Sequence, residues 1–259
     1  MKRLLMPALI LALAACNVTK PTPTSPSSSA AAEQTTAIRG EGAAGGTRAP
    51  EFAVELFVDY GVPAGASAAA TATSETDSYS LIQGGIRWAS GDPVNYSITG
   101  SEPIGGANTA ISNGVITIDH FVTARSFAIG SPSANPCGGS DVIQWMSIDG
   151  PGNVLASTAT CRNVATKEIV GFTITIDSDE TWSTSGTPNA FDVQEIITHE
   201  MGHVAGLGHD SAPRDGCLTM YKFASPGETQ KRTLGLGDKL GMDALYNTGN
   251  TSAGPGCGF

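Results

Sequence analysis

The chain has 259 residues, of which 40% are hydrophobic, and its formal charge is −10 at pH 7. A surface this acidic argues against binding to nucleic acid and against electrostatic attachment to anionic lipid. The length suits one domain with a real core plus additional segments, and the sequence shows no internal repeat.

The N-terminus has the pattern of a secretory signal. Lys2 and Arg3 precede an apolar run that is too short to span a bilayer. The run ends in Leu-Ala-Ala-Cys at Cys16, which resembles the lipobox of bacterial lipoproteins. The resemblance implies that residues 1–15 are removed and that Cys16 is acylated, which leaves a mature charge of −12 because two positive charges are lost (−10 − 2). An ordinary signal peptide with a chance cysteine is the alternative.

The following segments differ in composition. Residues 16–50 are dominated by Ser, Thr, Pro, Ala and Gly, which predicts a disordered tether. Residues 51–60 alternate in polarity as a strand does, with Phe, Val, Leu and Val at every second position. For residues 51–80 the sequence leaves two interpretations open, a prosegment or an N-terminal extension that adds a strand. Spaced apolar groups with frequent glycine predict a folded domain over residues 81–259.

A helix is predicted within the stretch TPNAFDVQEIITHEMGHVAGL, residues 187–207. Asp192 is the expected N-cap, and Glu195 three residues later completes a capping-box pattern. His199 and His203 are four residues apart, so both imidazoles leave the helix on one side and can meet one metal ion.

The third metal ligand is expected beyond a turn. Gly206 can take the left-handed conformation that ends a helix, and this turn would bring His209 back to the same ion. Three imidazoles leave an open position for water, as in catalytic zinc sites, and Glu200 is the candidate general base. The alternative, polar surface histidines, requires the whole H-E-x-x-H-x-x-G-x-x-H pattern to arise by chance, so we favour zinc.

Four cysteines remain besides Cys16, and an even number in an exported protein favours disulfides. The preferred pairs are Cys137 with Cys161 and Cys217 with Cys257, because each joins segments on one side of the histidine motif. A cysteine-ligated zinc is the competing interpretation, but no two of them have the close C-x-x-C spacing.

With these motifs the chain resembles the matrixins, a family of metzincin metallopeptidases. Beyond the zinc motif, CLTMY offers Met220 as the residue of a Met-turn, eleven positions after the third histidine. Three further segments are similar to matrixin catalytic domains, namely DGPGNVLA (149–156), TIDSDETW (175–182) and RTLGLGDKLGMDALY (232–246). The resemblance covers residues 84–247.

The resemblance implies an α+β fold of the metzincin type. A twisted, mixed and mostly parallel five-strand sheet with two helices would precede the Met-turn and a C-terminal helix. Residues 85–98 would form the first strand. Residues 108–127 would hold the first helix, although the run Val-Ile-Thr-Ile at 115–118 favours a strand.

The resemblance also assigns binding roles. Leu155 and Ala156 would lie on the edge strand that pairs antiparallel with a bound peptide. A structural calcium ion would be held by three carboxylates and two loop carbonyl groups, those of Asp149, Asp177, Glu180, Gly150 and Gly152. Ser157 and Thr175 stand where the family's second zinc site has histidines, so we expect one zinc ion. Because no cysteine lies between positions 16 and 137, a cysteine switch is not available.

These features predict a zinc-dependent endopeptidase that is exported and lipid-anchored to a bacterial membrane, at the cell surface or on the periplasmic face. We expect a monomer with a protein or peptide substrate and no nucleic-acid partner. The alternative is a catalytically silent binding or adhesion lipoprotein on the same scaffold, which would not need Glu200. A zinc peptidase with a glutamate ligand is unnecessary, since His209 supplies the third ligand. The remaining histidine, His120, is expected to be exposed and not catalytic.

Overall fold

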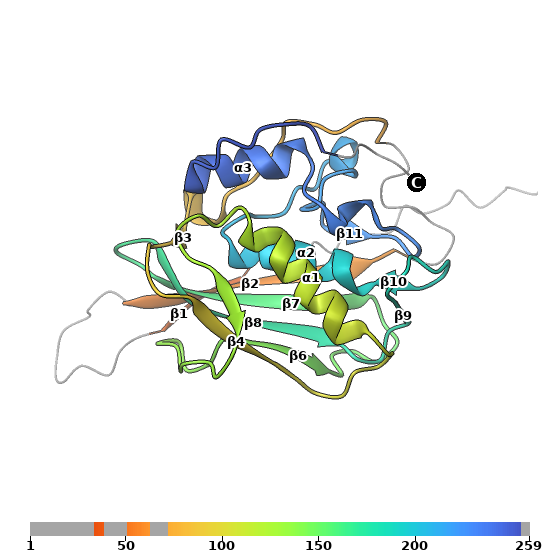
Figure 1. Ribbon diagram of the computed structural model, residues 1–259, viewed down its shortest axis with the longest axis horizontal. Helices are drawn as coiled ribbons and strands as arrows, with labels where there is room; N and C mark the ends of the chain where they lie inside the picture. The colour runs from red at the N-terminus through yellow and green to blue at the C-terminus, as the bar shows by residue number, and fades with distance from the viewer. Residues whose placement is uncertain (1–33, 39–50, 63–71, 255–259) are drawn as a thin grey trace, which may run out of the picture. The chain divides into compact units, whose positions relative to one another are not determined.

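A computed structural model describes residues 34–38, 51–62 and 72–254 (Figure 1). The signal segment, Cys16 and Cys257 lie outside these residues. The strands and α-helices are β1 (Gln34–Ile38), β2 (Phe52–Gly61), β3 (Arg87–Trp88), β4 (Val94–Thr99), α1 (Ala107–Asp119), β5 (Phe127–Ile129), β6 (Val142–Met146), β7 (Val154–Asn163), β8 (Glu168–Asp177), β9 (Trp182–Ser183), β10 (Phe191–Asp192), α2 (Val193–Val204), β11 (Phe223–Ala224) and α3 (Leu236–Tyr246).

A mixed sheet forms the base of the fold. Within the described residues it has nine strands in the order β1-β2-β7-β8-β6-β4-β5, with β11 beside β2 and β3 beside β8. In the series β1-β2-β7-β8 each strand is antiparallel to the next. In the series β8-β6-β4-β5 each strand is parallel to the next. The expected α+β class is therefore confirmed, with helices and a mixed sheet in one fold.

The sheet is larger than the five strands that the resemblance implies. Residues 34–38, which their composition places in the tether, pair with β2, and β2 pairs along almost its whole length with β7. An open strand edge has unpaired N–H and C=O groups, and these added strands satisfy them. The expected first strand, 85–98, is split into β3 and β4 because Gly91 and Pro93 interrupt it.

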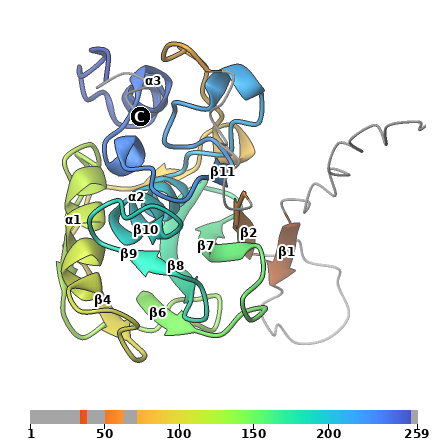
Figure 2. The ribbon, with the colours of Figure 1, turned by 90° about the vertical axis from the view of Figure 1, so that its right-hand side faces the viewer.

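Helices α1 and α2 cover one face of the sheet (Figures 1 and 2). The helix expected within 108–127 is confirmed as α1, despite its strand-favouring run. Ile111, Val115 and Ile118 of α1 are buried at helical spacing, so packing against the core outweighs their local preference. Gly114 lets the helices approach closely, because a Cβ there would lie 2.8 Å from the side chain of Ile197 on α2.

Apolar side chains of the sheet and of both helices form one core. Ile143, Phe172, Ile174 and Ile176 come from β6 and β8 and pack toward the helices as fully buried residues. Burying a side chain of this size stabilises the fold by roughly 1.5–3 kcal/mol. The core thus fixes α2, which carries the first two histidines, against the sheet.

One of the two expected disulfides, that between Cys137 and Cys161, lies within the described residues and is confirmed. Cys137 is bonded to Cys161 on β7, with their Cα atoms 5.9 Å apart. Cys217 is buried, and its expected partner Cys257 lies outside the described residues. In the described part of the chain, no helix has the length and apolar character needed to cross a bilayer.

Candidate metal centre

Helix α2 begins as the sequence predicts. The side chain of Asp192 caps it by accepting a hydrogen bond of 3.1 Å from the N–H of Glu195. The return bond of a capping box is not made: within the described residues neither oxygen of the buried Glu195 carboxylate receives a hydrogen bond. Asp192 instead pairs with Arg232, which joins the start of α2 to the segment before α3.

The chain turns sharply after α2. Gly206 has a φ of 104°, and a Cβ at this position would overlap the carbonyl oxygen of Ile86, so only glycine fits. The turn returns His209 to the two helical histidines, as the motif predicts. The backbone of Asp210 then pairs with the Met-turn, its N–H donating to Met220 and its carbonyl oxygen accepting from Lys222.

The three histidines converge through their Nε2 atoms. The distances between these atoms are 3.1 Å for His203 and His199, 3.1 Å for His203 and His209, and 3.2 Å for His209 and His199. Tetrahedral zinc binds imidazole nitrogens at about 2.0–2.1 Å, which requires a similar spacing between its ligands. The residues present therefore fit a zinc ion.

The other ring nitrogens explain why the Nε2 atoms face one another. Nδ1 of His199 lies 2.7 Å from the carbonyl oxygen of Thr219, and Nδ1 of His203 lies 2.8 Å from that of Leu207. A carbonyl oxygen can only accept, so each Nδ1 carries the proton and each Nε2 presents a lone pair. Burial, together with the neighbouring His209, lowers the pKa of both rings well below its usual value. The rings are thus neutral ligands.

The Met-turn lies directly under the histidines. Met220 is fully buried, and a Cβ at Gly202 of α2 would overlap its sulfur atom, so the glycine within HEMGH makes room for the methionine. Asp238 of α3 fixes this turn by accepting hydrogen bonds from the N–H groups of Thr219, Met220 and Gly235, at 2.7, 3.1 and 2.9 Å. Because Thr219 orients His199, α3 supports the metal centre.

Glu200 is buried beside the histidines. Its Oε2 accepts a hydrogen bond of 2.5 Å from the hydroxyl of Thr158 on β7, whereas Oε1 receives none within the described residues. Burial, and next the carboxyl of Asp59 on β2, raises the pKa of Glu200 well above its usual value. The side chain is therefore oriented by β7 and disposed to take up a proton.

A second group of buried charges lies beside Glu200. Lys231 is fully buried, donates to the carbonyl oxygen of Phe223 at 2.8 Å and pairs with Glu228 at 3.1 Å. Burial, followed by the charge of Glu228, raises the pKa of Glu195 well above its usual value. Burial also raises the pKa of Asp59 to about 7, although Lys231 opposes this. We call Asp59, Glu195, Glu228 and Lys231 the buried charge cluster.

The acidic residues assigned to calcium also come together. Asp149, Asp177 and Glu180 each offer a carboxylate oxygen, and these atoms all lie within 4.8 Å of one another. The Asp177 carboxylate accepts from the N–H groups of residues 148, 149 and 179. The carbonyl oxygen of Gly150, an expected ligand, accepts instead from the N–H of Gly152 at 2.6 Å.

The edge strand expected to hold a peptide is already paired. Leu155 and Ala156 lie on β7, and both are fully buried. Ala156 stands opposite Asp59 of β2, so β2 already occupies the backbone edge of β7 at this point. His120 ends α1 as an exposed residue, as expected.

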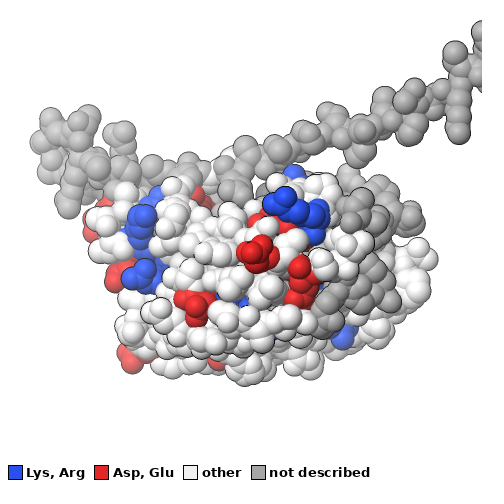
Figure 3. Space-filling view, turned by 90° about the horizontal axis from the view of Figure 1, so that it is seen from above, with Lys and Arg blue, Asp and Glu red and all other residues white. Residues whose placement is uncertain are grey.

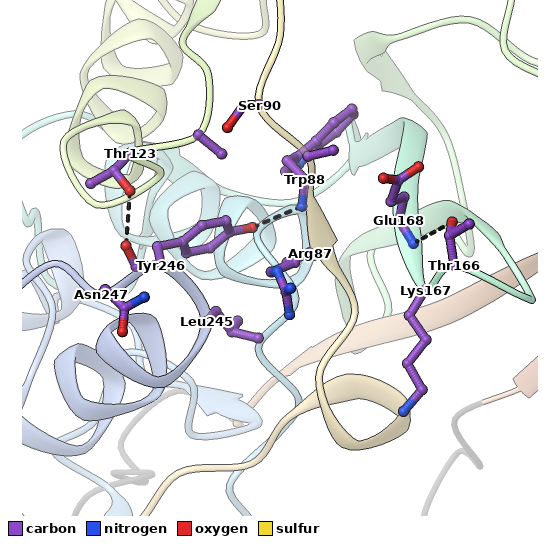
Figure 4. A pocket seen from close by; sticks show the side chains of 12 residues that line it. Arg87, Trp88, Ser90, Thr123, Thr166, Lys167, Glu168, Leu245, Tyr246 and Asn247 are labelled. Atoms are coloured by element: carbon purple, nitrogen blue, oxygen red, sulfur yellow. Dashed lines mark hydrogen bonds between the residues drawn. The ribbon is translucent and has the colours of Figure 1, made fainter.

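A separate cavity of about 360 Å³ lies where α3 meets β3 (Figure 4). Its polar groups are used to hold the fold. The hydroxyl of Tyr246 accepts from the N–H of Trp88 at 3.2 Å and donates to the carbonyl oxygen of Ala205 at 2.8 Å, and Thr123 donates to the carbonyl oxygen of Tyr246. The histidines and Glu200 are not among its lining residues, so it is not the chemical site.

The sequence alone did not single out several residues that shape this centre, namely Asp59, Thr158, Gly202, Lys231 and Asp238. Gly202 carries a usable signal, since a glycine inside a buried helix indicates a close neighbour. The other residues act through contacts with elements distant in the sequence, and no local pattern marks them.

Comparison with known proteins agrees with this geometry. Residues 139–247 match the family model described as Matrixin. Human matrilysin is 34% identical over 104 residues, which cover 40% of this chain and 36% of the relative. Metalloendoproteinase 1 of Glycine max is 38% identical over 76 residues, 27% of this chain and 24% of the relative. Mouse stromelysin-3 is 31% identical over 101 residues, 39% of this chain and 18% of the relative.

The chain thus spans about a third or less of the length of these relatives. The matched segment nevertheless contains all three histidines, the Met-turn and α3. Residues 139–247, which hold the histidines, are therefore similar to a matrixin domain of the metzincin type.

Proposed function

We propose that this protein is a zinc-dependent endopeptidase that hydrolyses peptide bonds of proteins. The observation that carries the proposal is the convergence of three neutral imidazoles beside a buried glutamate of raised pKa. His199, His203 and His209 would hold the ion, which would polarise the carbonyl group of the peptide bond and make a water molecule more acidic.

Glu200 supplies the proton transfer in this proposal. Its carboxylate takes the proton of the attacking water and passes it to the leaving amine, and the hydroxyl of Thr158 holds it in position. The alternative, a silent binding lipoprotein on this scaffold, gains no support from the site, because binding alone does not require a carboxylate held in position beside three converging imidazoles.

The experiment compares the zinc-loaded chain, in a form whose site is open to a peptide, with a Glu200→Gln variant of the same form on a library of quenched peptides. We expect the variant to bind one zinc ion but to cleave at least about 10²-fold more slowly, since a general base contributes on the order of 10²–10⁴. Glu102→Gln, at an exposed position, is the matched control and should cleave normally. Equal cleavage by the Glu200→Gln variant, or no cleavage by a zinc-loaded chain whose site is open to a peptide, would contradict the proposal.

We further propose that Asp149, Asp177 and Glu180 bind a calcium ion that stabilises the loop between β6 and β7. Three carboxylates within reach of one ion suit calcium, which takes oxygen ligands. Burial and the charges of Asp177 and Asp149 raise the pKa of Glu180, so a cation at this point would relieve their repulsion.

The proposed setting is a monomeric, exported chain anchored through acylated Cys16, with a protein or peptide substrate and no nucleic acid. Figure 3 supports the last point for one face, where acidic and basic side chains lie near one another instead of forming a basic stripe. Metabolic labelling with a fatty acid, compared between the native chain and a Cys16→Ser variant, tests the anchor. Equal labelling of both would refute it.

A further inference from the structure

Strand β2 lies between two segments that border the metal centre. It pairs antiparallel with β7 from Phe52 to Tyr60, and at its end Tyr60 and Gly61 pair parallel with β11. Figure 2 shows β11 beside the end of β2. Hydrogen bonds of 2.9 Å from Gly61 to Asn153 and from Val62 to Ala224 close both sides. An extended peptide bound by backbone pairing would make the same kind of contacts.

The side chains of β2 cover the chemical groups. Phe57 stacks on the ring of His203, with centroids 4.2 Å apart, and meets His209 edge-on at 5.7 Å. His199, His203 and Glu200 are 2%, 0% and 0% exposed. A peptide carbonyl and a water molecule must both reach these groups during hydrolysis. With β2 in place, His199, His203 and Glu200 are closed to them, and His209 is half-buried.

Strand β2 packs closely against the rest of the domain over most of its length. Glu55 forms a buried ion pair of 2.7 Å with Arg162 of β7. Gly61 passes close to Leu155 and Phe191, where a Cβ would lie 3.2 Å from Leu155 and would overlap the ring of Phe191. The exception is Asp59, whose carboxylate is buried in the charge cluster and receives no hydrogen bond of normal geometry within the described residues.

We propose that β2 is an internal occupant of the substrate groove, held between β7 and β11 over the histidines, and that it must leave before a peptide can enter. This inference rests on the proposed function, because it takes the groove beside Glu200 to be the place of the substrate. It also gives β2 an inhibitory role that needs no cysteine, and the chain has none between positions 16 and 137.

A tethered occupant competes strongly. A segment joined to the domain by a short linker acts at an effective concentration on the order of millimolar, so a free peptide at lower concentration is excluded. The apparent affinity for a peptide is reduced by the fraction of molecules in which the groove is open. Freeing β2 from its tether should restore the affinity.

The test uses four forms of the full-length, zinc-loaded chain. These are the uncut and the cut chain, each with and without a disulfide that locks β2 to β7. A recognition sequence for a site-specific protease is inserted after Ala64, so that the chain can be cut between β2 and the rest of the domain. A lock is added by Val58→Cys with Ser157→Cys, which stand opposite one another on β2 and β7 with half-buried side chains. Opposed Cα atoms in an antiparallel pair lie about 4.5–5.5 Å apart, which suits a disulfide.

The first measurement is binding of a fluorescent peptide hydroxamate by anisotropy, after gel filtration has removed any freed segment. We expect the cut, unlocked chain to bind at least about tenfold more tightly than the uncut chain. The cut, locked chain should bind as weakly as the uncut one, because its β2 is retained. Leu56→Cys with Ala159→Cys, a second opposed pair, should reproduce this lock.

Equal binding by all four forms would overturn the proposal. The proposal would also be overturned if gel filtration and mass spectrometry showed that the segment stays bound after the cut. Loss of the folded circular-dichroism spectrum by the cut domain would have the same meaning, because β2 would then be a permanent part of the fold. Peptide cleavage is measured separately. Tight binding without cleavage by the cut, unlocked form would leave the groove inference standing and refute the proposed function instead.

Discussion

Asp238 offers the sharpest test of how α3 supports the metal centre. Its carboxylate is fully buried and accepts three backbone N–H groups around the Met-turn. An Asp238→Ala variant leaves these donors without a partner, at a cost of about 1–3 kcal/mol each. The gross loss of stability is therefore on the order of 6 kcal/mol.

A second effect opposes this loss. Burial raises the pKa of Asp238 from 3.8 to about 6, so the ionised group already weakens the native state above that pH. The shift corresponds to about 3 kcal/mol at neutral pH. Because alanine removes the buried charge as well, the net loss for Asp238→Ala at pH 7 should be about 3 kcal/mol.

Asparagine separates the two effects. Thr219 and Gly235 donate to the same carboxylate oxygen, Oδ2, which an amide oxygen can replace, while the bond from Met220 to Oδ1 is lost. Asp238→Asn should therefore cost less than about 1 kcal/mol at pH 7, because loss of the charge offsets loss of one hydrogen bond.

The pH dependence has a definite sign. A carboxyl whose native pKa is raised stabilises the fold at low pH, and this contribution is lost as pH rises from about 4 through about 6. The native chain should therefore lose stability relative to Asp238→Asn over this range. Urea unfolding of both variants between pH 4 and 8 measures the difference.

Zinc affinity provides the second readout. The carbonyl oxygen of Thr219 orients His199, and loss of a group that supports a ligand typically weakens metal binding about 10–100-fold. Competition with a chromophoric chelator should show such weakening for Asp238→Ala and much less for Asp238→Asn. Our account would be refuted if Asp238→Ala cost under about 1 kcal/mol with unchanged zinc affinity, or if both variants behaved alike.

Three further predictions concern stability. Replacing Cys137 and Cys161 by serine opens a loop with a sequence separation of 24, which should lower the free energy of unfolding in urea by about 3 kcal/mol; an unchanged midpoint would contradict this. Calcium should raise the melting temperature of the chelated native chain but not of Asp177→Asn, and equal shifts would refute the calcium site. Gly202→Ala should cost about 1–3 kcal/mol by crowding the Met-turn sulfur, whereas Gly105→Ala, with open space around it, should be nearly neutral; equal costs would contradict this.

The convergence of the three histidines could be predicted because it depends on local rules. Spacing of four residues on a helix fixes the relation of His199 to His203, and a glycine in the left-handed conformation fixes the turn to His209. Neither step requires knowledge of distant parts of the chain. For α1 the local preference of residues 115–118 favoured a strand. The helix forms because its apolar residues are buried at helical spacing.

The position of β2 could not be predicted, because strand pairing is decided by contacts far apart in sequence. Alternation indicates a strand and is silent about its neighbour. Alternation also does not decide which face of the strand is buried: the apolar residues at 52, 54, 56 and 58 are half-buried, whereas Glu55 and Asp59 are buried on the other side with Phe57. Arg162 explains Glu55, and no sequence pattern marks that pair.

The charge cluster acts on β2 and on any peptide that replaces it. Asp59 is buried beside Glu195 and Glu228, with Lys231 already paired, so a carboxylate is poorly held there. It follows from the groove proposal that β2 is weakest at Asp59, beside Glu200. A substrate with an amide or hydroxyl side chain at the same position could donate to Glu195, whose oxygens receive no hydrogen bond from the part of the chain that the structure describes. The features that make the internal strand replaceable would therefore also disfavour acidic substrate residues at this position.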